Sequence, residues 1–400
     1  MSQSVRPLAE LRVLELGQLL AGPFCGSILG YFGAEVIKVE PPGGDPIRGW
    51  RVLDEGGTSW WWRSLGRNKK CITVDLRSER GQDMVRRLAE RSDVLVENFS
   101  PGVLERWGLA PEALKALNPR LVIARISGYG QDGPYASRPG FASVCEGISG
   151  FRHLNGFPGE VPVRTNLSIG DTIAGLHATL GILLALRARD AQVDGVGQVV
   201  DVALYESMFN LLEAVVPEYS GAGVVRQPAG TTVTGIVPTN TYRCSDGRCV
   251  VIGGNGDSIF RRLMEAIGRE DLASDPQLAS NAGRVERERE IDAALAAWCV
   301  TRNASDVLAI LQDWRVPSGP IYDVADLSAD PHFRARGLFE QVEVDGRRLE
   351  IPALMPRLCD TPGSTEWPGQ AVGSHTDEVL RDVLGLDDAE IATLHADGVI

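Results

Sequence analysis

The chain has 400 residues, a formal net charge of -13, and charged and apolar residues in ordinary globular proportions. This length predicts two domains, or one large and one small, with enough apolar material for a sizeable core. The acidic balance argues against a nucleic-acid or anionic-membrane partner, because both need a basic surface, although a few local Lys and Arg residues can still bind an anionic small molecule.

The cysteines and the N-terminal segment point to a reducing compartment. Seven cysteines lie scattered from Cys25 to Cys359 without framework spacing, which is typical of reduced thiols. No secretory start precedes the strand-like segment 11–16, and the longest apolar run, Ile173–Leu186, is short for a bilayer span. We therefore expect a soluble, cytoplasmic protein with no membrane partner.

The first part of the chain alternates between strand and helix patterns. A strand, a turn, a helix and a second strand are predicted at Leu11–Leu16, Gly17–Gly22, Phe24–Phe32 and Glu35–Glu40. The pattern recurs with the strand Cys71–Leu76, the helix Gly81–Arg91, the strand Val94–Glu97, the helices Gly102–Gly108 and Pro111–Leu117, and the strand Leu121–Ser127. Such alternation predicts an α/β domain with a mostly parallel sheet.

The second part of the chain predicts a smaller domain and a return segment. The helix Thr172–Arg189, the strand Gln198–Ala203 and the helix Leu204–Val216 precede a Gly-rich loop at 221–235. A hairpin at 241–252 and the helices Ser258–Ile267, Arg284–Ala297 and Ala304–Trp314 follow, and then the strands Glu340–Val344 and Arg347–Ile351 and a helix after His375. We expect a large domain at 1–220, a small α+β domain at 221–325 and a return to the large domain at 326–400.

The sequence offers little support for a dinucleotide or metal site. The turn Gly17–Gly22 lacks the second glycine of Gly-x-Gly-x-x-Gly, although Glu40 ends the second strand where a ribose-binding acid would lie. Cys244 and Cys249 have no second cysteine pair or histidine beside them in the sequence, so we interpret them as packed thiols and predict no metal.

Asp171 heads the apolar helix and has two interpretations. After Gly170, an acid in this position is a typical N-cap. The same helix N-terminus also keeps a carboxylate ionised, and an ionised carboxylate beside a glycine can attack a thioester carbonyl. The local pattern does not choose between the two.

Several segments together resemble the class III CoA-transferases, the family of formyl-CoA transferase and carnitine CoA-transferase. The resemblance extends in order over nearly the whole chain, through Val13–Glu15, Ala21–Pro23, Gly33–Glu40, Arg67–Lys69, Asp75–Leu76, Val96–Gly102, Ser127–Gly130, Gly170–Asp171 and Gly373–Leu380. It implies a large doubly wound, Rossmann-like domain built from both chain ends, a small α+β domain, and a homodimer of interlocked chains. It also implies that Asp171 is the nucleophile, that coenzyme A enters as a substrate thioester with no further cofactor, and that the second substrate is a carboxylic acid.

The resemblance carries CoA contacts over to five regions of this chain. The implied contacts are Leu20, Ala21, Val74, Asp75, Leu76, Arg77, Asn98, Phe99, Ser100, Arg106, Ser127, Gly128, Tyr129 and Gly130. Arg106 would meet the CoA phosphates, and the Gly128–Gly130 segment or a small-domain loop would stabilise the oxyanions. Formyl-CoA transferase has a lysine in place of Ser127 and an arginine in place of Pro41, so Arg77 or Lys69 would have to supply those phosphate contacts.

Two alternatives and one subgroup complete the expectations. An α-methylacyl-CoA racemase pairs its aspartate with a histidine, but Phe141 stands at that position here and cannot shuttle a proton. A noncatalytic CoA-binding protein is the other alternative. The segments around Trp50, Ser59 and Arg67 are similar to the subgroup that moves CoA from succinyl-CoA to C4–C5 dicarboxylates such as malate, citramalate, itaconate or glutarate. A distal carboxylate needs a cation, and the candidates are Arg48, Arg51, Arg67 and Arg164.

Overall fold

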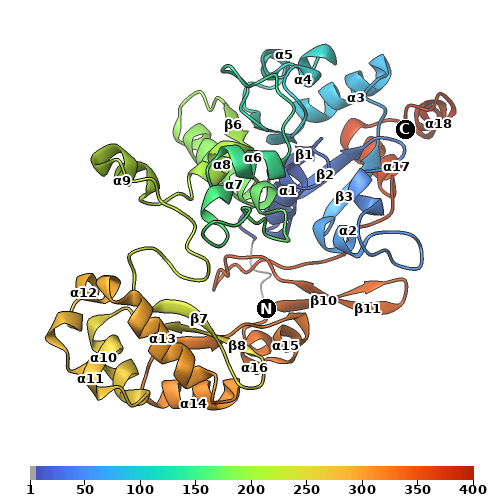
Figure 1. Ribbon diagram of the computed structural model, residues 1–400. Coiled ribbons are helices and arrows are strands. Elements are labelled where there is room, and N and C mark those ends of the chain that lie inside the picture. Colours follow the sequence, from blue (N-terminus) through green and yellow to red (C-terminus); the bar gives the residue numbers. More distant parts are fainter. Residues whose placement is uncertain (1–5) are drawn as a thin grey trace. The chain divides into compact units, whose positions relative to one another are not determined.

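A parallel sheet organises the larger part of the protein. A computed structural model describes residues 6–400, and within that range β1–β6 form a six-stranded sheet in the order β3-β2-β1-β4-β5-β6, with all neighbours parallel (Figure 1). The strands are β1 (Arg12–Glu15), β2 (Glu35–Glu40), β3 (Lys69–Thr73), β4 (Val94–Glu97), β5 (Val122–Ser127) and β6 (Val199–Ala203). The strand order reverses between β1 and β4, so this is a doubly wound α/β sheet. The predicted α/β class with a parallel sheet is confirmed.

Helices cover both faces of the sheet. One face packs against α3 (Glu79–Glu90), α5 (Pro111–Leu117), α17 (Thr376–Leu384) and α18 (Asp388–Ala396), and the other against α1 (Ala21–Tyr31), α6 (Ala142–Ile148) and α7 (Ile169–Ala191). The same unit holds η1 (Pro46–Gly49), α2 (Trp60–Leu65), α4 (Val103–Arg106), α8 (Leu204–Phe209), β10 (Phe339–Val344) and β11 (Arg347–Pro352). Successive residues of β1 divide between the two cores, since Val13 joins one cluster and Leu14 the other.

The chain divides into two compact units. Within the described residues, the larger comprises 6–151, 165–213 and 334–400, and the smaller comprises 152–164 and 214–333. Residues 152–164 therefore belong to the smaller unit, although the sequence analysis assigned them to the large domain. The smaller unit contains η2 (Arg152–Leu154), α9 (Val215–Ala222), β7 (Thr239–Arg243), β8 (Cys249–Gly253), α10 (Asp257–Ala266), α11 (Glu270–Ala273), η3 (Pro276–Leu278), α12 (Asn281–Glu286), α13 (Glu288–Cys299), α14 (Ala304–Asp313), β9 (Ser318–Pro320) and α15 (Val324–Ala329). α16 (Pro331–Ala335) contains the boundary at Phe333.

Most differences from the sequence prediction lie at helix ends. α1 begins at Ala21 rather than Phe24, so Gly22 and Pro23 lie inside its first turn. The helix predicted at 204–216 ends at Phe209, because the chain turns before α9 and Glu213 adopts a left-handed φ of 49°. Propensity does not mark this break, since no glycine or proline lies between the two helices.

α7 is longer than the apolar run suggested. It has 23 residues and, by length and composition alone, is long and apolar enough to cross a membrane, so the argument from the length of the apolar run was wrong. Its buried face, which includes Ala174, Ala178 and Ile182, packs into the core shared with α1 and the sheet. This burial is the behaviour of a core helix.

A buried ionic network holds the turn between β1 and α1. Glu15 bridges two lysines, at 3.1 Å from Lys38 Nζ and 2.8 Å from Lys69 Nζ. Lys38 also donates to the carbonyl of Gly17 (2.7 Å), and Lys69 to the carbonyl of Pro23 (2.5 Å), so one ammonium group fixes each end of the turn.

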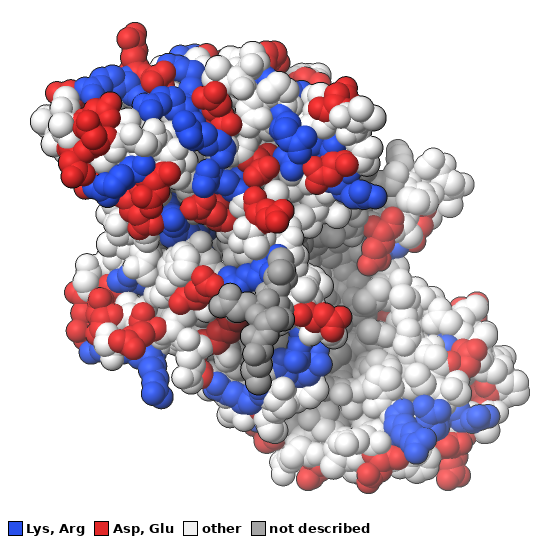
Figure 2. All heavy atoms as spheres, turned by 180° about the vertical axis from the view of Figure 1, so that it is seen from behind, with Lys and Arg blue, Asp and Glu red and all other residues white. Residues whose placement is uncertain are grey.

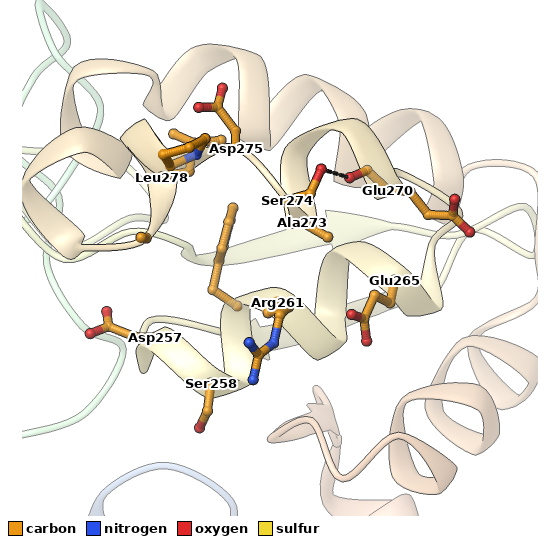
Figure 3. Close-up of a pocket in the computed structure, with 12 residues that line it drawn as sticks. Asp257, Ser258, Arg261, Glu265, Glu270, Ala273, Ser274, Asp275 and Leu278 are labelled. Atoms are coloured by element: carbon orange, nitrogen blue, oxygen red, sulfur yellow. Dashed lines mark hydrogen bonds between the residues drawn. The ribbon is translucent and has the colours of Figure 1, made fainter.

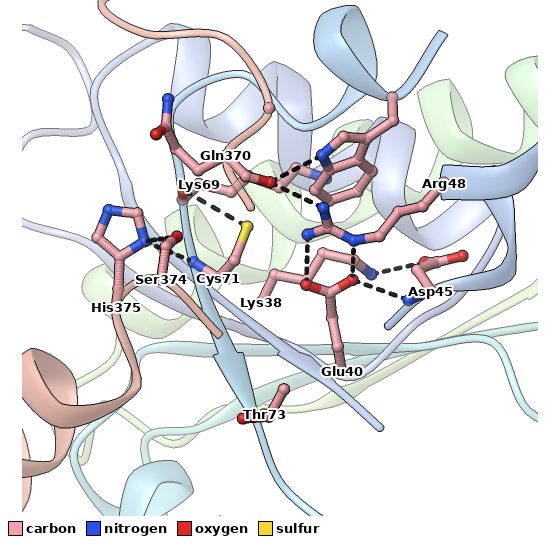
Figure 4. Close-up of polar contacts among 12 residues, drawn as sticks. Lys38, Glu40, Asp45, Arg48, Lys69, Cys71, Thr73, Gln370, Ser374 and His375 are labelled. Carbon is pink, nitrogen blue, oxygen red and sulfur yellow. Dashed lines mark hydrogen bonds and ion pairs between the residues drawn. The ribbon is translucent and has the colours of Figure 1, made fainter. Parts of the chain in front are cut away.

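Further charges extend the network on the side of β2 (Figure 4). Asp45 lies 2.9 Å from Lys38 Nζ and accepts the backbone N–H of Leu19 (3.1 Å), a residue in the left-handed conformation (φ 63°). Arg48 pairs with Glu40 (2.6 Å). Burial lowers the pKa of Lys38, but Asp45, Glu15 and Glu40 outweigh it and the pKa is raised; for Lys69 burial dominates over Glu15 and the pKa is lowered.

The two charge signs are interspersed on the face seen in Figure 2. Among the described residues on that face, Lys and Arg therefore do not form the continuous basic surface that nucleic-acid binding would need.

The close approach of α1 to the network predicts an effect of a single methyl group. A Cβ added at Gly26 would lie 1.9 Å from Glu15 Oε2, so Gly26→Ala must displace either the helix or the carboxylate. We expect a loss of about 1–3 kcal/mol in the free energy of unfolding, measured by urea denaturation. Gly147→Ala in α6 is the matched control, because a Cβ there meets nothing within 4 Å, and it should be neutral or stabilising by up to about 1 kcal/mol. Equal urea midpoints for the two variants would contradict this account of the network.

Candidate active site

The switch point of the sheet brings two of the predicted contact segments together. Leu20 and Ala21 follow the turn after β1, and Asn98, Phe99 and Ser100 follow β4. The Asn98 side chain accepts the N–H of Gln18 (2.7 Å) and donates to its carbonyl (2.8 Å), which ties the two loops to each other. Crevices of this kind, at the carboxyl ends of strands where the order reverses, are where doubly wound sheets bind ligands.

A cavity of about 360 Å³ lies beside the switch point, at the carboxyl ends of β2 and β3. Val74, Asp75, Leu76, Arg77 and Phe99 line it, so the structure brings these predicted contacts together. Trp107, which sequence reasoning missed, also lines it and meets the Phe99 ring edge-on at 5.2 Å. An apolar cavity with a few polar groups at its rim is a typical small-molecule site.

The cations expected at the CoA phosphates differ in their availability. Arg106, at the end of α4, is exposed and makes no ion pair within residues 6–400. Arg77 is exposed at the cavity and pairs with Asp75 (2.9 Å). Lys69, by contrast, is fully buried between Glu15 and Pro23, so the hypothesis that it replaces a missing phosphate contact is wrong.

The loop after β5 is a tight turn. Ser127 Oγ accepts the N–H of Gly130 (3.0 Å), and Gly130 adopts a φ of 88° that favours glycine. A Cβ on Gly128 would lie 2.9 Å from the Cα of Gly140, so the backbones approach closely there. Because the Gly130 N–H is engaged, the expected oxyanion donor in this segment cannot be that group.

Asp171 lies in the first turn of α7, where Ser168 is the N-cap residue. Of the two interpretations left open by the sequence, the N-cap is wrong: two residues of helix, Ile169 and Gly170, precede Asp171. Asp171 is half-buried. It lies close enough to Cys145 of α6 to affect that thiol: burial raises the pKa of Cys145 to about 11, and the negative charge of Asp171 is the second largest cause. An acid in the first turn still gains from the helix dipole, so the electrostatic argument for an ionised carboxylate holds.

Two further cavities differ in charge. One of about 590 Å³ opens beside the first turn of α7, with Ser168, Ile169 and Thr172 in its wall. The other, of about 690 Å³, belongs to the smaller unit (Figure 3). Its lining includes the carboxylates Asp257, Glu265, Glu270 and Asp275 and the cation Arg261. This acidic lining is unsuited to the phosphates of CoA.

Sequence reasoning missed side chains that position the site without lining it. Glu97 ends β4, accepts the N–H of Phe99 (2.7 Å) and pairs with Arg125 (2.8 Å). Burial raises the pKa of Glu97 to about 7 against the opposing effect of Arg125. Asp45 likewise accepts the backbone N–H of Leu19 and so positions the turn before Leu20. The sequence predicted that Glu97 ends a strand. Its pairing with Arg125 could not be predicted, because Arg125 lies on the neighbouring strand β5.

Comparisons with known proteins agree along the whole chain. The sequence signature of CoA-transferase family III matches residues 8–376. The chain is 46% identical to succinyl-CoA–D-citramalate CoA-transferase of Chloroflexus aurantiacus, over 99% of this chain and 98% of that protein. It is 33% identical to succinate–glutarate CoA-transferase of Agrobacterium fabrum, over 94% of this chain and 96% of that protein.

Solved structures of similar fold agree with these sequence comparisons. A CAIB/BAIF family protein from Brucella suis superimposes with a TM-score of 0.82 at 34% identity, covering 94% of this chain and 99% of that one. Signature, relatives and fold converge, and the chain belongs to CoA-transferase family III.

Proposed function

We propose that this CoA-transferase moves CoA from succinyl-CoA to a C4–C5 dicarboxylic acid, with the carboxylate of Asp171 as the covalent carrier. The observation that carries the assignment of the nucleophile is the place of Asp171 in the first turn of α7, where a carboxylate is favoured in its ionised form. Support for the substrates comes from relatives named for succinyl-CoA with D-citramalate, L-malate and, with succinate, glutarate.

The proposed sequence exchanges partners on one carboxyl group. The Asp171 carboxylate attacks the thioester carbonyl of succinyl-CoA, the C–S bond breaks, and a mixed anhydride and CoA thiolate result. The thiolate then attacks the aspartyl carbonyl, releasing succinate and forming an aspartyl-CoA thioester. The acceptor carboxylate displaces the thiolate to give a second anhydride, and the thiolate attacks the acceptor's carbonyl, which restores the Asp171 carboxylate. Together, these covalent steps replace one difficult direct exchange by several easier ones.

Trapping the carrier tests this proposal. After incubation with succinyl-CoA, mass spectrometry should find a CoA adduct on the peptide that contains Asp171, and hydroxylamine should convert it to a hydroxamate. Asp171→Asn, which keeps the shape of the side chain, should lower CoA transfer to D-citramalate, L-malate and glutarate by about 10³-fold or more while the circular dichroism stays unchanged. Full activity in this variant, or turnover without any adduct, would refute the mechanism.

We also propose that the enzyme acts in the cytoplasm as a homodimer of interlocked chains, without a further cofactor. An apolar stripe on α7 supports a partner: Leu176, Leu180 and Leu184, spaced four residues apart, are 43%, 54% and 62% exposed. Such a stripe is unusual on a free surface. Two relatives of this chain are named as the alpha and beta subunits of a succinyl-CoA–L-malate CoA-transferase, so an enzyme of that name has more than one subunit.

Subunit exchange tests the interlocking. Two preparations that differ only in a peptide tag should each run as a dimer in light scattering. On mixing, they should not form mixed dimers until both are unfolded and refolded together, because threaded chains cannot separate while folded. Because a threaded dimer can separate only by unfolding, Leu180→Glu should lower the urea midpoint of the dimer without releasing folded monomers. Val224→Glu, an exposed apolar position outside α7, is its control. Monomers, or rapid exchange in the native state, would contradict the proposal.

A further inference from the structure

The cavity beside α7 adjoins the turn that carries the proposed nucleophile. Ser168, Ile169 and Thr172 belong to the same helical turn as Asp171, and they line the cavity of about 590 Å³. Leu20, one of the implied CoA contacts, lines it as well. The remaining wall is largely apolar and includes Trp61. A small organic acid in this cavity would therefore have one end near the reacting carboxyl group and an apolar wall along its length.

The charges in the cavity wall leave one cation available. Glu350 is the carboxylate among the described residues that line this cavity, and it is paired with Arg334 (3.0 Å). Arg67 is almost fully buried, and its guanidinium donates to the Ser64 carbonyl (2.7 Å), the Ser64 hydroxyl (2.6 Å) and the Pro352 carbonyl (2.7 Å). Every guanidinium nitrogen of Arg67 thus donates to the protein, and a fourth bond goes to the Thr365 hydroxyl (3.2 Å), so this side chain is committed to the fold.

Arg51 is different. Its guanidinium carbon lies 4.1 Å from the centroid of the Trp61 ring, and within residues 6–400 it has no ion pair. Stacking uses the face of the guanidinium and leaves its in-plane N–H groups able to bind a carboxylate with two hydrogen bonds. The other two arginines that the sequence offered for the distal carboxylate do not line this cavity. Arg48 is bound to Glu40, and Arg164 belongs to the smaller unit.

The backbone at Arg51 is held in an uncommon conformation. Its φ is 62°, a left-handed value that is costly for a side chain of this size. The strap that carries it is closed by hydrogen bonds from the Trp60 N–H to the Val52 carbonyl (3.1 Å) and from the Asp54 N–H to the Thr58 carbonyl (2.7 Å). The arginine is therefore presented by a fixed segment, and backbone strain of this kind concentrates at functional positions.

We infer that Arg51, stacked on Trp61, binds the distal carboxylate of the acyl group and thereby selects dicarboxylates. The inference rests on the proposed function, because it places the reacting carboxylate at Asp171. One site serves both halves of the exchange, so Arg51 binds the succinyl group of the donor as well as the acceptor acid. A monocarboxylate of the same length fills the apolar wall but leaves the guanidinium without a partner, which is how a polar site rejects an analogue that lacks the polar group.

Two reactions test the inference, one between dicarboxylates, which have a distal carboxylate, and one between monocarboxylates, which lack it. In the first, CoA moves from succinyl-CoA to glutarate; in the second, butyryl-CoA exchanges with isotope-labelled butyrate. Arg51→Gln should lower kcat/KM of the first reaction by about 100-fold and leave the second within about threefold. Arg51→Lys, which keeps the charge but loses the bidentate geometry, should fall between wild type and Arg51→Gln in the first reaction. Arg302→Gln is the matched control, because Arg302 stacks on Trp298 (4.7 Å) and does not line this cavity, and it should change neither reaction.

The outcomes separate this inference from the function beneath it. Equal losses in both reactions, or no loss in either, would overturn the role of Arg51 while leaving the chemistry at Asp171 intact. A wild-type enzyme that exchanges butyrate but transfers no CoA to any dicarboxylate would overturn the acceptor class, and the inference with it. An Asp171→Asn variant that remains active in both reactions would instead refute the carrier.

Discussion

The site depends on a set of charges that are buried from solvent. Glu15 lies fully buried at the end of β1 and holds two ammonium groups, and each of these takes a carbonyl at one end of the β1–α1 turn. Taking such groups out of water costs several kcal/mol per ion, and an apolar core of the same volume would often be at least as stable. What the network supplies in return is a defined shape for the turn: Leu19 is held left-handed, and Leu20 and Ala21 emerge at a fixed place beside the switch point.

The parallel sheet does the rest of the positioning. Since all six strands of this sheet run the same way, the turn after β1 and the loops after β3, β4 and β5 reach one edge of the sheet. The return segment of the chain closes that arrangement: the His375 N–H donates to the Cys71 carbonyl (2.9 Å), and the Thr376 hydroxyl accepts the N–H of Thr73 (3.0 Å). The C-terminal motif that resembles the family thus has a structural task, which is to fasten β3 to α17.

The predictability of each feature follows from how far its cause extends along the chain. The strands of the first domain were recognisable because their apolar runs and turn residues are local, and β2 and β4 were placed with the bounds that the structure has. The break between α8 and α9 was not, because it has no local marker. The partners of the arginines were beyond reach for a stronger reason: Arg48 bonds Gln370 and Arg67 bonds Pro352, which lie about three hundred residues away in the sequence. From sequence alone, these arginines and Arg51 look alike.

That distinction decides what each arginine can do. A guanidinium whose N–H groups are already bound to buried carbonyls and carboxylates can only hold the fold, because releasing it would leave those acceptors unsatisfied at a cost of about 1–3 kcal/mol each. Arg48 and Arg67 are of this kind: Arg48 belongs to the network around the β1–α1 turn, and Arg67 ties its own segment to the return segment at Pro352. A guanidinium stacked on an aromatic ring keeps its hydrogen-bonding edge, so binding an anion costs it no existing bond. Arg51 is the cation in the wall beside α7 that meets this condition, and so the framework that occupies its neighbours is also what leaves selection of the acid to this one side chain.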